Sequence, residues 1–343
     1  FTKEFDNVDN LKTLEEKFLK LVQKMEYLFE GLYELNKYGI GTILDYSIEG
    51  KEGDDDLDYT VIEIIATIKK AGSTMAIPFS VFKPTGIAQF SILEKANEGI
   101  SNLNEKELES YNKIVERFDT ICKAAYELDV PLFIDAEDSW IQNTIDRLCE
   151  NMMVKYNTEK VVIYNTLQFY RWDRLEYLKC LHRKAKKNGS KIGVKLVRGA
   201  YMEKERERAS TMGYIDPIQK TKEDTDVDYD LGLKYCVENL DHISICAGTH
   251  NEDSSQFLAE LMRKNGVDKT DKRIYFAQLL GMSDHISFNL SSERYNVAKY
   301  VPYGPVNEVL PYLIRRAEEN TSVAGQTNRE LSLIQREIRI RRC

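Results

Sequence analysis

A phenol, two guanidinium groups and a carboxylate are spaced to share one side of a helix near the C-terminus of this chain. Tyr312, Arg315, Arg316 and Glu319 follow one another at helical spacing. Arginine grips a carboxylate through two parallel hydrogen bonds, and a neighbouring glutamate can hold its guanidinium in place. The pattern therefore predicts a site for a substrate that carries a carboxylate. It also suits a solvated helix with surface ion pairs, so both interpretations stay open on this segment alone.

The chain before this segment alternates between strand and helix. Short β-branched runs are separated by longer segments of helical period, such as residues 58–71 and 105–128. Eight strand and helix units predict an α/β fold, a closed (β/α)8 TIM barrel of parallel strands. A doubly wound open sheet is the alternative, but Gly39-x-Gly41-x-x-Leu44 lacks the third glycine of a dinucleotide fingerprint. The expected strands are 41–47, 75–82, 131–135, 160–166, 191–197, 243–248, 273–278 and 296–301.

Polar residues gather at the ends of these expected strands, where barrel active sites form. Each has an ordinary structural explanation alone: Asp135 could cap the next helix, and His250 could be a buried, hydrogen-bonded histidine. Together, in one ring, they predict a site. The residues are Glu49, Lys83, Asp135, Asn165, Thr166, Lys195, Arg198, Thr249, His250, Gln278 and Tyr300.

Composition excludes several classes of function. No apolar run approaches the ~20 residues of a membrane span, and a net charge of −8 argues against nucleic acid as a partner. The six cysteines are scattered without a C-x-x-C pair, which favours a reducing, cytoplasmic compartment. The four histidines show no ligand spacing, so no metal is expected.

Six sequence blocks, in order, resemble the proline dehydrogenase family, in particular its single-function enzymes. The resemblance covers about residues 39–339. The blocks are Leu132-Phe-Ile-Asp-Ala-Glu137, Ile163-Tyr-Asn-Thr-Leu-Gln168, Lys195-Leu-Val-Arg-Gly-Ala-Tyr-Met-Glu-Lys-Glu205, Gly248-Thr-His-Asn251, Gln278-Leu-Leu-Gly-Met282, and Tyr300-Val-Pro-Tyr-Gly-Pro305 with the Arg315–Arg316 pair.

The resemblance implies a distorted barrel with FAD at its mouth and a C-terminal helix above the mouth. We expect residues 39–343 to form this FAD-binding barrel and residues 1–38 to form an extra helical segment. Because the chain starts with Phe1, we expect a native N-terminus, with any targeting signal, to be missing.

The family's substrate and cofactor contacts fall on particular residues of this chain. Lys195 stands where many members have an arginine near flavin N5, and Asn165 where others have a glutamine. The implied substrate contacts are Arg315, Arg316 and Lys83 at the carboxylate, Asp135, Leu279, Tyr300 and the aromatic Tyr201 around the pocket, and Glu49, which pairs with Arg315 in a gate. The implied FAD contacts are Asp135, Ala136, Asn165, Lys195, Val197, Arg198, Gly199, Ala200, Tyr201, Thr249, His250, Asn251, Gln278 and Glu319.

The implied reaction is oxidation of L-proline to (S)-1-pyrroline-5-carboxylate by hydride transfer from C5 to FAD N5, the first step of proline catabolism to glutamate. The implied electron acceptor is a quinone, with peripheral contact on the inner membrane of a bacterium or of a mitochondrion. The basic tail at residues 336–342 could supply that contact, or could be a solvated helix end. The alternatives are a hydroxyproline dehydrogenase, disfavoured by Tyr300, and a lyase or aldolase barrel that forms a Schiff base on Lys83 or Lys195.

Overall fold

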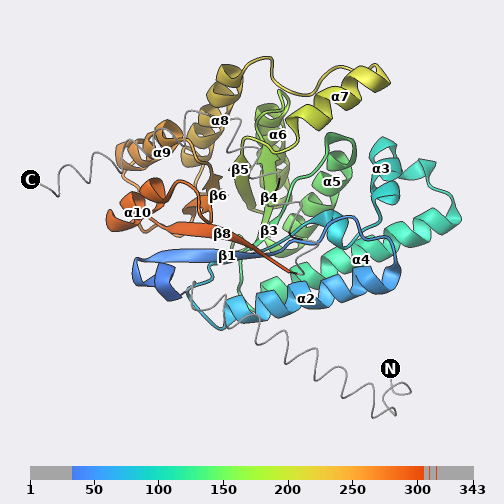
Figure 1. Ribbon diagram of the computed structural model, residues 1–343, viewed down its shortest axis with the longest axis horizontal. Coiled ribbons are helices and arrows are strands. Elements are labelled where there is room, and N and C mark those ends of the chain that lie inside the picture. The colour runs from blue at the N-terminus through green and yellow to red at the C-terminus, as the bar shows by residue number, and fades with distance from the viewer. Residues whose placement is uncertain (1–32, 305–308, 310–313, 315–343) are drawn as a thin grey trace, which may run out of the picture.

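The structure, a computed structural model, describes residues 33–304 together with Val309 and Ile314. Within this range, parallel strands pair in consecutive order from β1 to β8 and close into a barrel (Figure 1). The ring closes where β1 pairs with β8 along its whole length. The predicted α/β fold and closed eight-stranded barrel are therefore confirmed.

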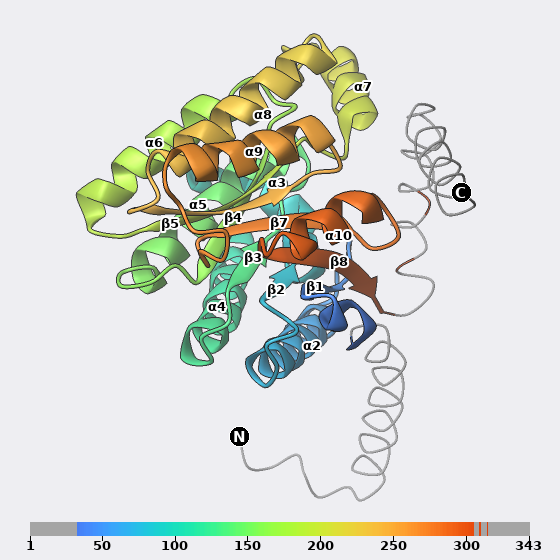
Figure 2. The ribbon, with the colours of Figure 1, turned by 90° about the vertical axis from the view of Figure 1, so that its left-hand side faces the viewer.

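Each of the strands β1 to β7 is followed by at least one helix, and Figure 2 shows helices wrapped around the outside of the strands. The strands are β1 Ile40–Tyr46, β2 Phe79–Phe82, β3 Leu132–Ile134, β4 Ile163–Gln168, β5 Ile192–Val197, β6 Ile243–Gly248, β7 Ile274–Leu279 and β8 Val297–Tyr303. The helices are α2 Asp54–Gly72, α3 Phe90–Glu98, α4 Glu105–Glu127, α5 Ser139–Tyr156, α6 Arg174–Asn188, α7 Met202–Met212, α8 Lys222–Val237, α9 Glu252–Lys264 and α10 Asp284–Ser292, with 3-10 turns at Pro84–Gly86 and Ile100–Asn102.

Local sequence signals explain where α4 begins and why β2 is shorter than expected. Asn104 and Glu107 form a capping box, in which each side chain accepts a hydrogen bond from the other's backbone N–H. The expected strand 75–82 is wrong at its start, because β2 begins only at Phe79. Pro78 has no N–H to give to a strand ladder, and Met75 is 98% exposed.

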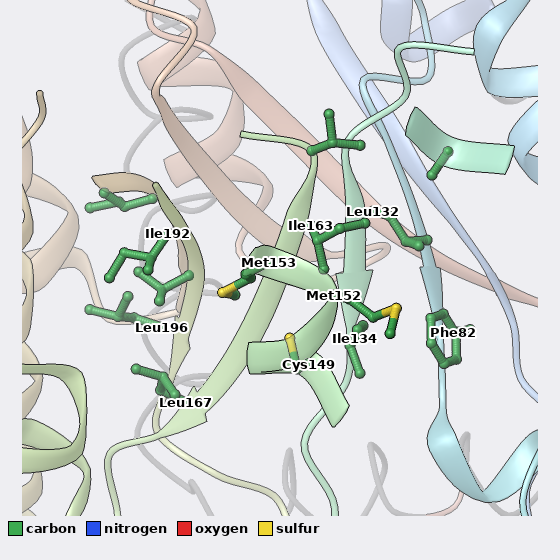
Figure 3. Close-up of a cluster of buried hydrophobic side chains, with 14 of the residues drawn as sticks. Phe82, Leu132, Ile134, Cys149, Met152, Met153, Ile163, Leu167, Ile192 and Leu196 are labelled. Carbon is green, nitrogen blue, oxygen red and sulfur yellow. The ribbon is translucent and has the colours of Figure 1, made fainter. Parts of the chain in front are cut away.

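The apolar core has two layers, separated by strand alternation. The larger layer lies between the barrel and its helices, where residues such as Ile134, Ile163 and Met153 pack together (Figure 3). The smaller layer fills the inside of the barrel, where the Phe79 and Phe133 rings stack with their centroids 4.3 Å apart. This inner layer packs the barrel below the polar strand ends.

The predicted N-terminal helical segment lies outside the described residues, except that residues 33–37 are helical. The C-terminal helix expected above the barrel mouth also lies outside them. Within the described part of the chain, no helix combines the length and apolar character that crossing a membrane requires.

Candidate active site

A cavity of about 410 Å³ opens at the carboxyl ends of the barrel strands. This volume is in the range of ligand pockets, about 300–1,000 Å³. The lining combines strand-end side chains with the residues that directly follow β5, β6 and β7. It consists of Ile43, Lys83, Asp135, Ala136, Thr166, Gln168, Lys195, Val197, Arg198, Gly199, Ala200, Tyr201, Lys222, Gly248, Thr249, His250, Asn251, Ala277, Gln278, Leu279, Met282 and Tyr300.

Asp135 is the centre of the buried polar network in this cavity. Its carboxylate accepts a hydrogen bond from Lys195 Nζ and one of 2.9 Å from the Tyr300 hydroxyl. Lys83 Nζ lies 3.3 Å from the same carboxylate, and Thr166 Oγ1 lies 3.4 Å from it. Burial alone would raise the pKa of Asp135, but Lys195 and Lys83 outweigh burial and lower that pKa to about 2. Asp135 is therefore ionised at neutral pH and holds both lysines at the cavity floor.

A second buried carboxylate, Asp45 on β1, stands behind Lys83. Asp45 is fully buried, accepts a hydrogen bond from Ser47 and lies 3.5 Å from Lys83 Nζ. Burial raises the pKa of the Asp45 carboxyl, and Lys83 opposes that rise. Burial alone would lower the pKa of Lys83, yet Asp45 and Asp135 hold it well above its usual value. Lys83 therefore stays an ammonium ion although it is only 7% exposed.

Two aromatic rings beside this network stabilise the Lys195 cation and shape the cavity floor. Lys195 Nζ lies 5.2 Å from the centre of the Tyr300 ring and 5.1 Å from that of Phe133. These distances are within the range of cation–π attraction. Tyr300 is 8% exposed, so its ring forms an almost rigid wall of the cavity floor.

Arg198 organises the side of the cavity formed by the ends of β5 and β6. It bonds Asp226 at 2.6 Å, Thr249 at 2.7 Å and Ser254 at 2.9 Å. Gly199 then turns the chain with φ +141°, and a Cβ there would come within 2.5 Å of the Tyr170 ring. Glycine is thus required by a close contact at this turn.

The ends of β6 and β7 place three further predicted residues on the cavity wall. His250 Nδ1 lies 3.1 Å from Ser283 Oγ, and Asn251 caps α9 by accepting a hydrogen bond from Ser254 N. Gln278 Nε2 donates to the carbonyl of Thr249 at 3.3 Å, while its Oε1 accepts from Ser287 at 2.8 Å.

The prediction that Asn165 contacts a cofactor is wrong in this structure, because Asn165 faces the helices. Its Nδ2 donates to Asp146 at 2.9 Å, and it does not line the cavity. Asn165 and Thr166 are adjacent in β4, which ends at Gln168, and adjacent strand residues face opposite sides, so both cannot face the cavity. Alternation turns Tyr164, Thr166 and Gln168 inward. Gln168 is therefore the amide that β4 gives to the cavity, and its Oε1 accepts from Ala200 N at 3.3 Å.

Most of the other predicted residues do meet in the cavity. Glu49 stands at its margin, with Oε1 4.0 Å from Lys83 Nζ, and is absent from the lining. Arg315, Arg316 and Glu319 lie outside the described residues, and so does the proposed pair between Glu49 and Arg315. The predicted residues that line the cavity are Lys83, Asp135, Ala136, Thr166, Lys195, Val197, Arg198, Gly199, Ala200, Tyr201, Thr249, His250, Asn251, Gln278, Leu279 and Tyr300.

Sequence reasoning missed Asp45 and Gln168, and strand alternation could have found both. Asp45 comes two residues after the inward-facing Ile43, and Gln168 comes two residues after Thr166. Met282 and Lys222 also line the cavity, but Met282 lies in the connection after β7 and Lys222 begins helix α8, so strand alternation does not single them out.

Comparison with known proteins relates most of the chain to one enzyme family. The family model described as "Proline dehydrogenase" matches residues 29–329. The chain is 35% identical to proline dehydrogenase 1, mitochondrial, of Dictyostelium discoideum over 351 residues, covering 90% of this chain and 61% of that protein. It is 43% identical to the human protein of the same name over 238 residues, covering 68% of this chain and 40% of that protein.

The fold is also found among solved structures. The crystal structure of proline utilization A from Bdellovibrio bacteriovorus, inactivated by N-propargylglycine, superposes with a TM-score of 0.76. That alignment covers 86% of this chain and 31% of the other, at 21% identity, and so it supports the fold alone. The family match over residues 29–329 shows more than that: the chain belongs to the proline dehydrogenase family.

Proposed function

We propose that this chain oxidises L-proline to (S)-1-pyrroline-5-carboxylate with FAD as its cofactor. The observation that carries the proposal is the buried network in which Asp135 holds Lys83 and Lys195 beneath Tyr300, at the floor of the cavity. Two ammonium groups in a pocket of limited size suit a small amino acid with a carboxylate. Family membership supports the same substrate.

The chemistry of the cavity lining fits FAD. Neutral amides from Gln168 and Gln278 could hydrogen-bond the edge of a flavin ring, and Lys195 offers the positive charge that a reduced flavin needs nearby. Arg198 and Lys222 offer cations for phosphate groups at the end of the cavity where α9 begins. We assign Asp135, Ala136, Val197, Gly199, Ala200, Tyr201, Thr249, His250 and Asn251 to the same cofactor, with Glu319 from outside the described residues.

Bound FAD supplies the acceptor for the hydride that leaves C5 of proline. The protein's contribution is orientation and exclusion of water. Lys83, with Arg315 and Arg316, holds the substrate carboxylate, while Leu279, Tyr201 and Tyr300 confine the ring. Glu49 pairs with Arg315 when the site closes. The ring nitrogen has to be neutral for its lone pair to assist the departure of the hydride, so the rate rises as the substrate amine loses its proton.

A hydroxyproline dehydrogenase is the second candidate within the same chemistry, and Tyr300 disfavours it. The buried phenol occupies the floor that an added 4-hydroxyl group would have to share. A Schiff-base lyase with Lys83 as its nucleophile is disfavoured by the protonation state of that lysine. A Schiff base needs a neutral amine, whereas Asp45 and Asp135 hold the pKa of Lys83 well above its usual value despite burial.

We also propose a quinone as electron acceptor, reached through a peripheral membrane contact of the basic tail at residues 336–342, outside the described residues. The relatives named above are called mitochondrial, which supports a membrane-associated pathway in eukaryotic members. Anionic lipid attracts a basic segment of this kind by ~1 kcal/mol per basic residue near the surface.

The visible spectrum of the purified protein tests the proposal. We expect flavin absorption bands that bleach when L-proline is added without oxygen and return when a quinone analogue is added. D-proline serves as the matched control, because it has the same charges with the opposite arrangement around Cα. A correctly folded protein that takes up no flavin on reconstitution would exclude the cofactor, and a bound flavin that L-proline leaves oxidised would exclude the substrate.

A further inference from the structure

Lys299 is a fully buried lysine in strand β8 that faces away from the cavity. Its neighbour Tyr300 belongs to the inner layer of the barrel, so alternation turns Lys299 outward, toward the start of α10. Its Nζ lies 2.6 Å from the carbonyl oxygen of Met282, 3.4 Å from that of Leu279 and 2.8 Å from Asp284 Oδ1. An ammonium group has three N–H donors, so it can serve all three acceptors at once.

These acceptors surround a sharply bent connection between β7 and α10, at residues 280–283. Gly281 and Ser283 both adopt left-handed conformations, with φ of +76° and +51°. Only glycine adopts this conformation freely, so Ser283 has to be held in it by its surroundings. Lys299 binds the carbonyl directly before Ser283 and the carbonyl at which β7 ends. The buried ammonium group of Lys299 thus holds this bend from the side that faces away from the cavity.

The front of the same connection forms part of the cavity wall. The side chains of Leu279 and Met282 line the cavity, and Ser283 holds the ring of His250 by a 3.1 Å contact. A change in the path of residues 279–283 would therefore move three lining side chains together. Tyr300 would keep its own contacts with Asp135, because those are made on the opposite face of β8.

We infer that Lys299 is a positioning residue, which sets the shape of the cavity wall formed by Leu279, Met282 and His250 through the carbonyls it binds. The inference rests on the proposed function for its kinetic consequence, because Leu279 is assigned to the proline pocket. Without the ammonium, the carbonyl of Met282 loses its donor and the carbonyl of Leu279 keeps only the N–H of Met282, so the connection gains alternative paths. Proline binding weakens, while the Asp135 network stays in place.

Lys299→Met tests this inference, because it keeps much of the side-chain volume and removes the donors. Amide hydrogen exchange, followed by mass spectrometry on the FAD-loaded protein, is the structural readout. We expect exchange at residues 279–286 to be at least about tenfold faster, with exchange in β3 and β5 unchanged. In the same preparation, KM for L-proline rises by at least about fivefold and kcat changes less.

Three further variants separate the possible causes. Lys272→Met makes the same substitution at an exposed lysine before β7 and leaves both readouts unchanged. Asp284→Asn removes the charged partner but keeps the carbonyl contacts, and we expect a smaller effect than that of Lys299→Met. Lys299→Arg keeps charge and donors and restores part of the loss. If Lys299→Met does not fold, Lys299→Gln replaces it, because its amide keeps two N–H donors.

The outcomes separate the role of Lys299 in fixing the connection from its effect on the proline site. Exchange that is unchanged at residues 279–286, or faster throughout the barrel, overturns the positioning role. Faster exchange confined to the connection with an unchanged KM overturns its effect on the proline site. Should the unaltered protein prove inactive with proline, local exchange would still support Lys299 as the residue that fixes the connection, and only the proposed function would fail.

Discussion

Replacing Lys83 by Met should destabilise the protein and weaken proline binding, for two separable reasons. Lys83 joins two buried carboxylates: Asp45 Oδ2 lies 3.5 Å and Asp135 Oδ2 lies 3.3 Å from its Nζ. Asp135 keeps Lys195 and the Tyr300 hydroxyl when Lys83 is lost. For Asp45, Lys83 is the one cation within ion-pair distance among the described residues. The stability cost therefore falls on Asp45.

The magnitude follows from burial. Asp45 has no exposed surface, and removing one partner of a buried ion pair costs about 3–5 kcal/mol. Burial already raises the pKa of Asp45, and Lys83 restrains that rise. Because the folded pKa lies above the unfolded value, ionised Asp45 opposes folding, and stability increases as the pH falls through the folded pKa. The deficit of Lys83→Met should therefore be largest at neutral pH and shrink as the pH is lowered and Asp45 takes up a proton.

Thermal unfolding of parent and variant across this pH range measures the first effect. Lys106→Met, at an exposed position on α4, is the matched control and should match the parent at every pH. Steady-state kinetics measure the second effect: losing a charge-assisted contact to the substrate carboxylate costs at least ~2 kcal/mol, or about thirtyfold in kcat/KM. If the difference in Tm between parent and variant stayed the same at every pH, the role of Lys83 beside Asp45 would be refuted. An unchanged kcat/KM would refute its contact with proline.

Three further substitutions test the substrate assignment. Arg315→Met and Arg316→Met should each lower kcat/KM for proline at least about thirtyfold, through loss of a bidentate contact of about 2–5 kcal/mol, while flavin content stays normal. If both arginine variants kept near-parental kcat/KM for proline, the assignment of Arg315 and Arg316 to the substrate carboxylate would be wrong. Tyr300→Ser should lower kcat/KM for L-proline and penalise 4-hydroxyproline less, because it removes buried bulk from the cavity floor. The ratio of the two efficiencies is the quantity to measure, and a ratio that moves toward proline contradicts the reasoning.

The barrel could be predicted from the sequence because its signals are local and repeated. The helices α2 and α4 carry apolar residues at helical spacing, and strands such as β5 are short and rich in β-branched residues. Strand boundaries were less predictable, since pairing partners decide where a strand ends. Leu167 and Gln168 join β4 because β5 extends alongside them, where Leu167 pairs with Leu196 and Gln168 with Val197. Asn165 was predicted to reach the cavity together with its neighbour Thr166, but adjacent strand residues face opposite sides, and Thr166 and Gln168 are the ones that face inward.

Lys299 and Tyr300 show why residue type alone cannot assign a role. They are adjacent, both polar and both buried, yet Tyr300 faces the inside of the barrel and Lys299 faces the outside. Tyr300 donates to Asp135 across the barrel, so its importance could be suspected from the ring of polar strand ends. Lys299 binds main-chain carbonyls of a connection that is 17 to 20 residues away in sequence. Any residue type supplies a carbonyl, so the acceptors leave no trace in the sequence, and the lysine becomes informative only when the bend it fixes is seen.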